Sequence, residues 1–198
     1  MTVFLFDLGG VCLSNHFGFS EQKKLITQFK LNSRNAESFF TSKLPSLNRG
    51  KLTEREFLAR LFESLGASHQ VEEAVQFLRS FDIANEEVLK LVRALQKFGT
   101  TAAFTNEALD ASDYRVQHFK LDSYFQHIFV SSRIGAAKPD ILAYKIVLEM
   151  LAVPPSEIVY VDNHERNLDA ARALGIQTIL FTSAAQLKTE LLRWASIT

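Results

Sequence analysis

The alternation of short apolar runs with helical patterns constrains the fold of this chain more than any other feature. Helical patterns lie between most of the runs, such as the apolar stripe that follows Asn85 and ends near Gly99. Several runs are continuously apolar, as expected for strands covered on both faces of a parallel sheet. Because strands that alternate with helices form right-handed βαβ units, we predict an α/β fold with a doubly wound sheet. Its strands are expected at residues 3–6, 101–104, 127–130, 158–161 and 177–181.

Residues 15–83 have a different pattern, with helical stripes and no convincing strand. The stretch "TERE" from Thr53 to Glu56 has the form of a capping box that opens a helix. We therefore predict a helical domain over 15–83, inserted into an α/β core domain formed by 1–14 and 84–198. Such an insert is expected to stand over the carboxyl edge of the sheet, where open α/β sheets bind their ligands.

The charge balance and the cysteine content limit the class of protein. The 22 Lys and Arg residues equal the 22 Asp and Glu residues, so no basic surface for nucleic acid is indicated. The single cysteine, Cys12, excludes an internal disulfide framework and fits a reducing compartment. No apolar run approaches the roughly 20 residues that a membrane span needs. We expect a cytoplasmic protein that binds neither nucleic acid nor membrane, and the oligomeric state, monomer or dimer, stays open.

Polar side chains follow three of the expected strands and precede one helix. Taken singly, each has an ordinary explanation as a turn former, a helix cap or a solvated charge. Taken together, they should converge on one crevice, where a lysine and a divalent cation would let two carboxylates stay ionised. That set suits phosphoryl transfer, in which positioning and charge neutralisation supply most of the catalysis. The residues are Asp7, Thr105, Asn106, Lys138, Asp162 and Asn163.

In order and in context, four segments resemble the motifs of the haloacid-dehalogenase-like (HAD) hydrolase superfamily. They are "FDLGGV", "FTN", "AKPD" and "VYVDNHERNLDAARALGI", and "LNRGKLTEREF" resembles a segment of the helical cap found in many members. The resemblance covers essentially the whole chain. It implies a five-stranded, Rossmann-like parallel core with an inserted helical cap. It also implies a magnesium-dependent phosphatase that acts on a small phosphorylated metabolite.

The resemblance implies a role for each matching residue. Asp7 would be the nucleophile that forms an aspartyl-phosphate, and Lys138 would assist the catalysis. Thr105, the Asn106 backbone and Lys138 would hold the phosphoryl oxygens. The ligands of Mg²⁺ would be Asp7, the Gly9 carbonyl and Asp162, because magnesium favours oxygen ligands.

Two positions depart from the usual motifs. Gly9 stands where most members have a second aspartate that acts as general acid and base. In this respect the chain resembles the phosphatase branch with an Asp-Xaa-Gly first motif. Asn163 stands where a second acid is common; it would support the metal site by orienting a bound water. His16 and His164 are alternative proton donors, although a solvent-facing or helix-start position is the ordinary expectation for each.

Two other functions stay open beside the phosphatase. One is a dehalogenase-type hydrolase that needs no metal, and the other is a catalytically weak binding or regulatory protein that keeps the pocket.

Overall fold

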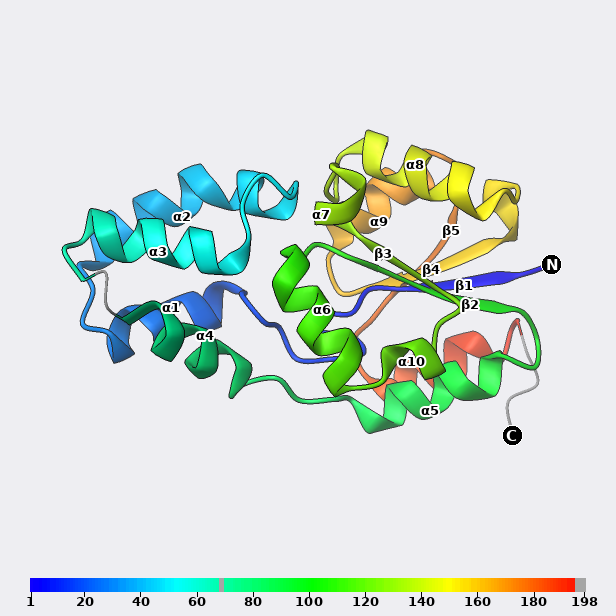
Figure 1. Ribbon diagram of the computed structural model, residues 1–198. Helices are drawn as coiled ribbons and strands as arrows, with labels where there is room; N and C mark the ends of the chain where they lie inside the picture. The colour runs from blue at the N-terminus through cyan, green and yellow to red at the C-terminus, as the bar shows by residue number, and fades with distance from the viewer. Residues whose placement is uncertain (68–69, 195–198) are drawn as a thin grey trace.

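The computed structural model of this protein describes residues 1–67 and 70–194, and it contains the expected parallel sheet. Its five strands are all parallel and lie in the order β3-β2-β1-β4-β5 (Figure 1). The doubly wound, five-stranded α/β architecture predicted from the apolar runs is therefore confirmed. The strands are β1 (Val3–Phe6), β2 (Thr100–Thr105), β3 (His127–Val130), β4 (Ile158–Asp162) and β5 (Gln177–Leu180).

The first strand lies at the centre of the sheet and fixes the register of its neighbours. Phe6 pairs with Ala103 on β2 and with Val161 on β4. The chain crosses from β1 to opposite sides of the sheet, so the strand order reverses there. Such a reversal opens a crevice at the carboxyl ends of the strands, which is where β1, β2 and β4 finish side by side.

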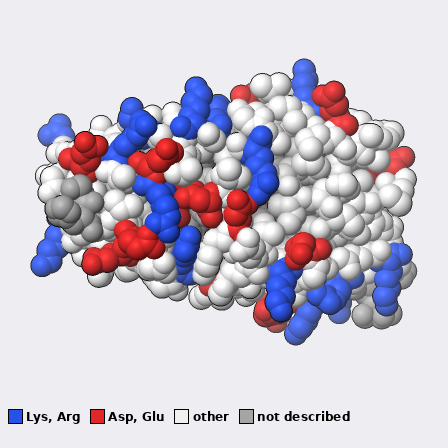
Figure 2. Space-filling model, in the orientation of Figure 1, with Lys and Arg blue, Asp and Glu red and all other residues white. Residues whose placement is uncertain are grey.

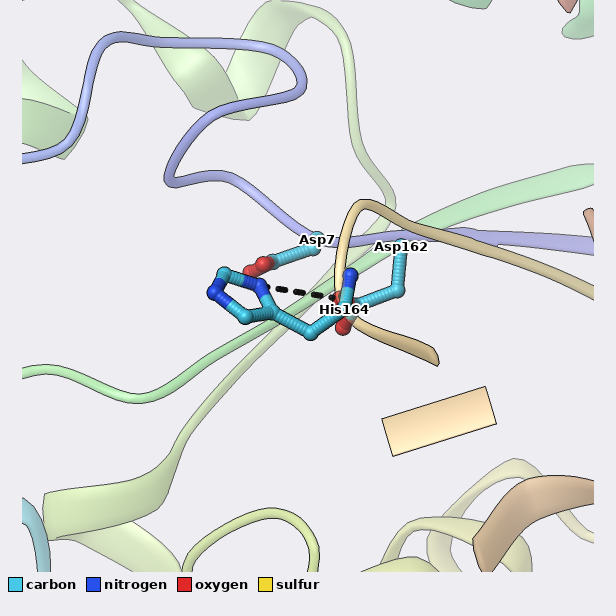
Figure 3. Close-up of side chains that lie close together, drawn as sticks. All are labelled: Asp7, Asp162 and His164. Carbon is cyan, nitrogen blue, oxygen red and sulfur yellow. Dashed lines mark hydrogen bonds and ion pairs between the residues drawn. The ribbon is translucent and has the colours of Figure 1, made fainter. Parts of the chain in front are cut away.

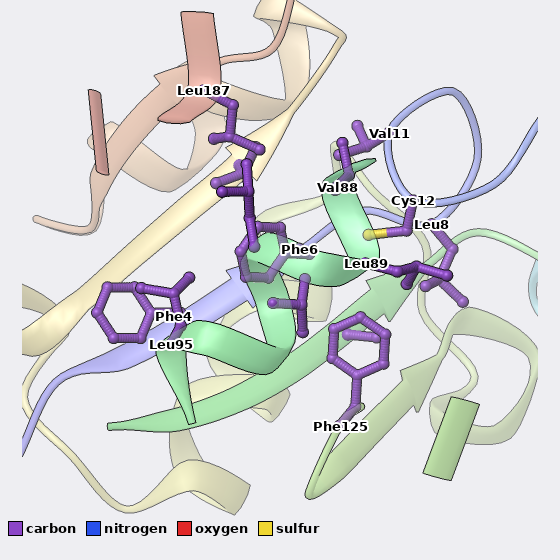
Figure 4. Close-up of a cluster of buried hydrophobic side chains, with 14 of the residues drawn as sticks. Phe4, Phe6, Leu8, Val11, Cys12, Val88, Leu89, Leu95, Phe125 and Leu187 are labelled. Atoms are coloured by element: carbon purple, nitrogen blue, oxygen red, sulfur yellow. The ribbon is translucent and has the colours of Figure 1, made fainter. Parts of the chain in front are cut away.

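Helices cover both faces of the sheet, which explains why the strand sequences are apolar without alternation. Successive side chains of a strand point to opposite faces. Phe4 and Phe6 therefore pack in one layer with α5 (Glu86–Leu95) and α10 (Ala184–Leu191), as Figure 4 shows. Val3 and Leu5 belong to the opposite layer, together with residues of α8 (Ile141–Leu151) and α9 (Glu165–Arg172). All four side chains of β1 are buried.

The ends of these helices follow local capping chemistry. The Asn85 side chain accepts a hydrogen bond from the Val88 amide at the start of α5, as expected for an N-cap. The helix ends at Leu95 and not at Gly99, because residues 96–98 form a turn. The Gly99 amide after this turn donates a hydrogen bond to the Leu95 carbonyl. The remaining elements of this part are α6 (Leu109–His118), η2 (Leu121–Ser123), α7 (Ser131–Ile134) and η3 (Pro155–Glu157).

Among the described residues between β1 and α5 there are four α-helices, and Figure 1 shows them grouped to one side of the sheet. The capping box predicted at Thr53 and Glu56 is present at the start of α3. The four helices have an apolar core of their own, which also takes in Ala108 and Ala111 at the start of α6. They are α1 (Phe19–Gln28), α2 (Ser33–Asn48), α3 (Glu54–Ser64) and α4 (Val71–Arg79). We call them the helical block; the domain boundaries at 14/15 and 83/84 stay a prediction.

The chain enters and leaves the helical block at the same place. The Ser14 amide donates to the Ile83 carbonyl at 2.8 Å, and the Ser14 hydroxyl donates to the Phe81 carbonyl at 2.7 Å. Leu13 and Ala84 form an antiparallel bridge beside them. The two connecting passages are thus paired with each other.

Basic and acidic side chains are interspersed over the helical block on the face drawn in Figure 2, whereas to its right they lie along the upper and lower rims and leave the middle largely uncharged. Within the described residues, no helix is both long enough and apolar enough to cross a membrane.

Candidate active site

The polar residues singled out in the sequence meet at the carboxyl edge of the sheet. Asp7 follows β1, whereas Thr105 and Asp162 are the last residues of β2 and β4. Thr105 and Asp162 were expected just after these strands, and that expectation is wrong by one residue. A cavity of about 290 Å³ lies at this edge, between the sheet and the helical block. The sheet side contributes Asp7, Gly9, Thr105, Asn106, Lys138, His164 and Asn167, and the helical block contributes Leu44, Leu47, Asn48 and Glu54.

The Lys138 ammonium joins the two predicted carboxylates. Its Nζ lies 2.9 Å from Asp7 Oδ1 and 2.9 Å from Asp162 Oδ2. It also donates to the Phe104 carbonyl at 2.8 Å and contacts the Tyr160 hydroxyl at 3.0 Å. The side chain is buried, so the ammonium is held in place by its acceptors and not by solvent.

Asp162 forms the floor of the site and does not itself line the cavity. Its Oδ2 accepts hydrogen bonds from the Tyr160 hydroxyl and from Asn167 Nδ2, and its Oδ1 accepts one from the His164 amide. Burial raises the pKa of Asp162, but the Lys138 charge and the hydrogen bond from Tyr160 outweigh it and leave the pKa below its ordinary value. Asp162 is therefore a fixed anion.

Asp7 has the opposite character. Burial raises its pKa from 3.8 to about 6, the Lys138 ammonium opposes the rise, and the negative charge of Asp162 adds to it. The Leu8 amide donates to Asp7 Oδ1 at 2.7 Å and fixes the carboxylate at the end of β1. Asp7 is thus more basic than an ordinary aspartate, and a nearby cation would favour its charged form.

Asp7, Asp162 and His164 form a group in which a metal ion could be held (Figure 3). One ligand atom from each lies within 4.8 Å of the others, and His164 Nδ1 is 3.6 Å from Asp162 Oδ1. Two carboxylates beside one ammonium leave a net negative charge, which fits a divalent cation. Carboxylate and carbonyl oxygens suit Mg²⁺, while the His164 imidazole suits softer metals. His164 was not among the predicted ligands; the Gly9 carbonyl, which was, belongs to a residue that lines the cavity.

The two glycines after Asp7 differ in what they require. Gly10 has a φ of +79°, and a Cβ there would lie 2.3 Å from Asn163 Nδ2. Gly9 has no such backbone angle, and a Cβ there would lie 3.2 Å from Asn15 Oδ1. The tight turn thus depends on Gly10. At Gly9 the space that a side chain would enter is bounded by the Asn15 side chain. Asn163 lies against Gly10 and does not appear among the residues that line the cavity.

The Asn106 side chain fixes the loop that carries Lys138. Asn106 Nδ2 donates to the Lys138 carbonyl at 2.8 Å, and the Lys138 amide donates to Asn106 Oδ1 at 2.9 Å. The side-chain amide of Asn106 is used in this reciprocal pair, and the binding of a phosphoryl oxygen by its backbone stays a prediction.

His16 does not lie where a surface or helix-start histidine would. It is buried, with Nε2 2.6 Å from Glu54 Oε1 and Nδ1 3.1 Å from Asp82 Oδ1. Burial lowers the pKa of His16, but the hydrogen bonds to Asp82 and Glu54 outweigh it and raise the pKa to about 10. The expectation of an exposed His16 is wrong because two acids from distant segments neutralise it. His164 is largely exposed and forms the N-cap of α9.

Several residues of the site were missed in the sequence. Tyr160 has a detectable signal, because it precedes Asp162 by two positions on one strand and so shares its face. Arg115 has none: it is a buried arginine of α6 whose Nη1 lies 2.6 Å from Glu107 Oε1. Asn167 and Glu54, which face the cavity from α9 and α3, likewise depend on packing that the sequence pattern does not show.

Comparisons with known proteins agree with this geometry. A family model described as haloacid dehalogenase-like hydrolase matches residues 1–175 of this chain. The bifunctional epoxide hydrolase 2 of Rattus norvegicus is 32% identical over 161 residues, which is 73% of this chain but 29% of that relative's length. This chain thus spans less than a third of that relative. The D-ribitol-5-phosphate phosphatase of Bacteroides thetaiotaomicron is 24% identical, covering 94% of this chain and 95% of the relative.

A solved structure shares the fold over nearly its whole length. It is a HAD family enzyme of Bacteroides thetaiotaomicron in a magnesium complex, with a TM-score of 0.83, 22% identity and 98% coverage of both chains. The family match extends from β1 through α9, the part of the chain that carries Asp7, Lys138 and Asp162. The chain belongs to the haloacid dehalogenase-like hydrolases.

Proposed function

We propose that this protein is a magnesium-dependent phosphatase of a small phosphorylated metabolite, with Asp7 as the nucleophile. The observation that carries the proposal is the arrangement of Asp7, Lys138 and Asp162 at the floor of the cavity. The relatives give support: one is a phosphatase of D-ribitol 5-phosphate, and another is a phosphatase of phosphorylated carbohydrates from Thermotoga maritima. The cavity of about 290 Å³ suits a substrate of small size.

The metal would be held by Asp7, the Gly9 carbonyl and Asp162, with Asn163 in support. A bound Mg²⁺ supplies charge neutralisation for the phosphoryl oxygens. Solved relatives that bind magnesium support this assignment for the family fold.

The residues of this chain divide the reaction into two steps. An Asp7 oxygen attacks phosphorus, and the bond from phosphorus to the ester oxygen breaks, so that the alcohol leaves with the bonding electron pair and takes up a proton. Water then attacks the phosphorus of the aspartyl-phosphate, which releases inorganic phosphate and restores the Asp7 carboxylate. Thr105, the Asn106 backbone and Lys138 bind the phosphoryl oxygens in both steps.

Gly9 leaves the departing oxygen without the carboxylic acid that most family members place there. General acid help is commonly worth about 10²–10⁴ in rate. We therefore expect the protein to hydrolyse phosphate esters with acidic leaving groups, such as phenyl phosphate, faster than alkyl esters.

The test is hydrolysis of a panel of phosphate esters by the full chain, with magnesium and with a chelator. We expect phosphate release with magnesium, little release with the chelator, and none from the Asp7→Asn variant, whose amide is nearly isosteric but a poor nucleophile. Melting temperatures of both proteins serve as the folding control. Release of halide from a haloacid in the presence of chelator would support the dehalogenase instead, and no turnover of any ester would support a binding protein.

A further inference from the structure

A chain of five buried ionisable side chains runs along the wall of the cavity. Glu54 Oε1 lies 2.6 Å from His16 Nε2, and His16 Nδ1 lies 3.1 Å from Asp82 Oδ1. Arg115 continues the chain, with Nε 3.3 Å from Asp82 Oδ1 and Nη1 2.6 Å from Glu107 Oε1. Every member has a side chain that is at most 5% exposed. We call this set the buried charge network.

The network has more negative than positive groups. Three carboxylates face one imidazolium and one guanidinium. Glu54 Oε2 and Glu107 Oε2 are both buried, and neither accepts a hydrogen bond from the residues that the structure describes. Glu54, Glu107, His16 and Arg115 line the cavity, whereas Asp82 does not.

Buried carboxylate oxygens without donors are costly, because burial removes their hydrogen bonds to water and no protein donor replaces them. The cations of the network bind other acceptors: His16 uses both ring nitrogens, and Arg115 Nη2 donates to the Ser14 carbonyl at 2.7 Å. Arg115 Nε is buried and forms no hydrogen bond with the residues that the structure describes. A ligand in the cavity can supply donors to the two carboxylate oxygens.

We propose that Glu54, together with Glu107, selects the leaving group of the substrate by accepting hydrogen bonds from it. The inference rests on the proposed phosphatase function and assigns the substrate class within it. The alcohol part of the ester carries hydroxyl or ammonium donors and no carboxylate. An ammonium fits best, because it offsets the excess negative charge as well as satisfying the oxygens.

The test compares phosphate esters that differ in the leaving group: 2-aminoethyl, 2,3-dihydroxypropyl, propyl, carboxymethyl and phenyl phosphate. Phenyl phosphate has no donor on its leaving group, so its hydrolysis by the wild type reports the phosphatase function alone. If none of the five esters is hydrolysed, the proposed function fails; if any is hydrolysed, the comparison among the esters tests the selection of the leaving group separately.

The measured quantity is the ratio of kcat/KM between wild type and Glu54→Gln for each ester, since this ratio cancels differences in leaving-group pKa. Glutamine keeps an acceptor oxygen but loses the charge. We expect the loss for 2-aminoethyl phosphate to exceed the loss for propyl and phenyl phosphate by about tenfold or more. The loss for 2,3-dihydroxypropyl phosphate should be intermediate, and carboxymethyl phosphate should improve.

Asp82→Asn is the matched control, because it removes a charge from the same network at a residue that does not line the cavity. We expect it to change kcat/KM of all five esters by a common factor. Melting temperatures check folding of both variants, and Glu54→Asp, which keeps the charge but shortens the side chain, replaces Glu54→Gln if that variant does not fold.

Two results would overturn the inference. One is an equal loss for all esters in the Glu54 variant. The other is the same selective pattern in Asp82→Asn, because it would show that the network acts through structure and not through contact with the leaving group.

Discussion

Replacing His16 with glutamine tests the buried charge network through its effect on stability. In the folded protein the imidazolium lies between Glu54 and Asp82, and its pKa is raised from 6.5 to about 10. One pKa unit corresponds to about 1.4 kcal/mol, so this interval corresponds to roughly 5 kcal/mol of stabilisation by the protonated ring. That figure agrees with the cost of about 3–5 kcal/mol for removing one partner of a buried ion pair.

The sign of the pH dependence follows from which state keeps the proton. Between pH 6.5 and about 10 the folded protein holds a proton on His16 that the unfolded chain has released. The free energy of unfolding therefore falls as the pH rises through this window. The contribution of His16 is complete below pH 6.5 and is lost above about pH 10.

Urea unfolding of wild type and His16→Gln at pH 6, 7, 8 and 9.5 measures this contribution. Taking the difference between the two proteins cancels the titrating groups that do not interact with His16. We expect a difference of several kcal/mol at pH 6 that shrinks by about 1.4 kcal/mol for each pH unit above 6.5. A difference that stays constant over this range would refute the assignment of a protonated, ion-paired His16.

Three further perturbations address the site and its support. Asp162→Ala should weaken magnesium binding strongly in calorimetry and Asn163→Ala should weaken it less; equal binding by wild type and Asp162→Ala would remove the metal assignment. Gly10→Ala should lower the free energy of unfolding by about 1 kcal/mol or more because of its φ of +79°, while Gly9→Ala, whose Cβ meets only the Asn15 side chain, should cost less in the same urea experiment. Asp110→Ala should cost about 1 kcal/mol of stability, because Asp110 accepts hydrogen bonds from the Glu54 and Arg55 amides at the start of α3; an unchanged melting temperature would argue against that contact.

The sheet could be predicted from the sequence because its signal is local. Each strand carries a short, largely apolar run. β1 and β3 match the expected ranges, β4 and β5 differ by one residue at one end, and β2 is longer by one residue at each end. Three of the errors fall on polar residues that continue a ladder: Thr100 pairs with Val3, Thr105 with Val130 and Asp162 with Leu180. The fourth is Phe181, which lies beyond the end of β5. A polar side chain at the end of a strand does not extend the apolar pattern, so the pattern stops early.

The charge network could not be predicted, since its signal is not local. His16 meets acids that lie 38 and 66 residues away, and no spacing rule in the sequence joins them. The convergence of Asp7, Lys138 and Asp162 was predictable because each lies next to the end of a strand or the start of a helix. The parallel sheet brings these ends to one edge. Residues that the sheet does not place, such as Arg115 and Glu54, became visible only with the packing of α3 against α6.

The paired passages at Ser14 and Ile83 make the helical block an exchangeable part of the molecule. Closing a loop costs entropy that depends on how far apart its ends must be brought. Here the ends are already hydrogen-bonded neighbours, with the Ser14 amide and hydroxyl bound to residues 83 and 81. A short turn can therefore close the sheet where the whole block now intervenes, and a block of another length or sequence can be joined at the same two points. The cavity wall that α2 and α3 supply can thereby differ while the strands that hold Asp7 and Asp162 stay as they are.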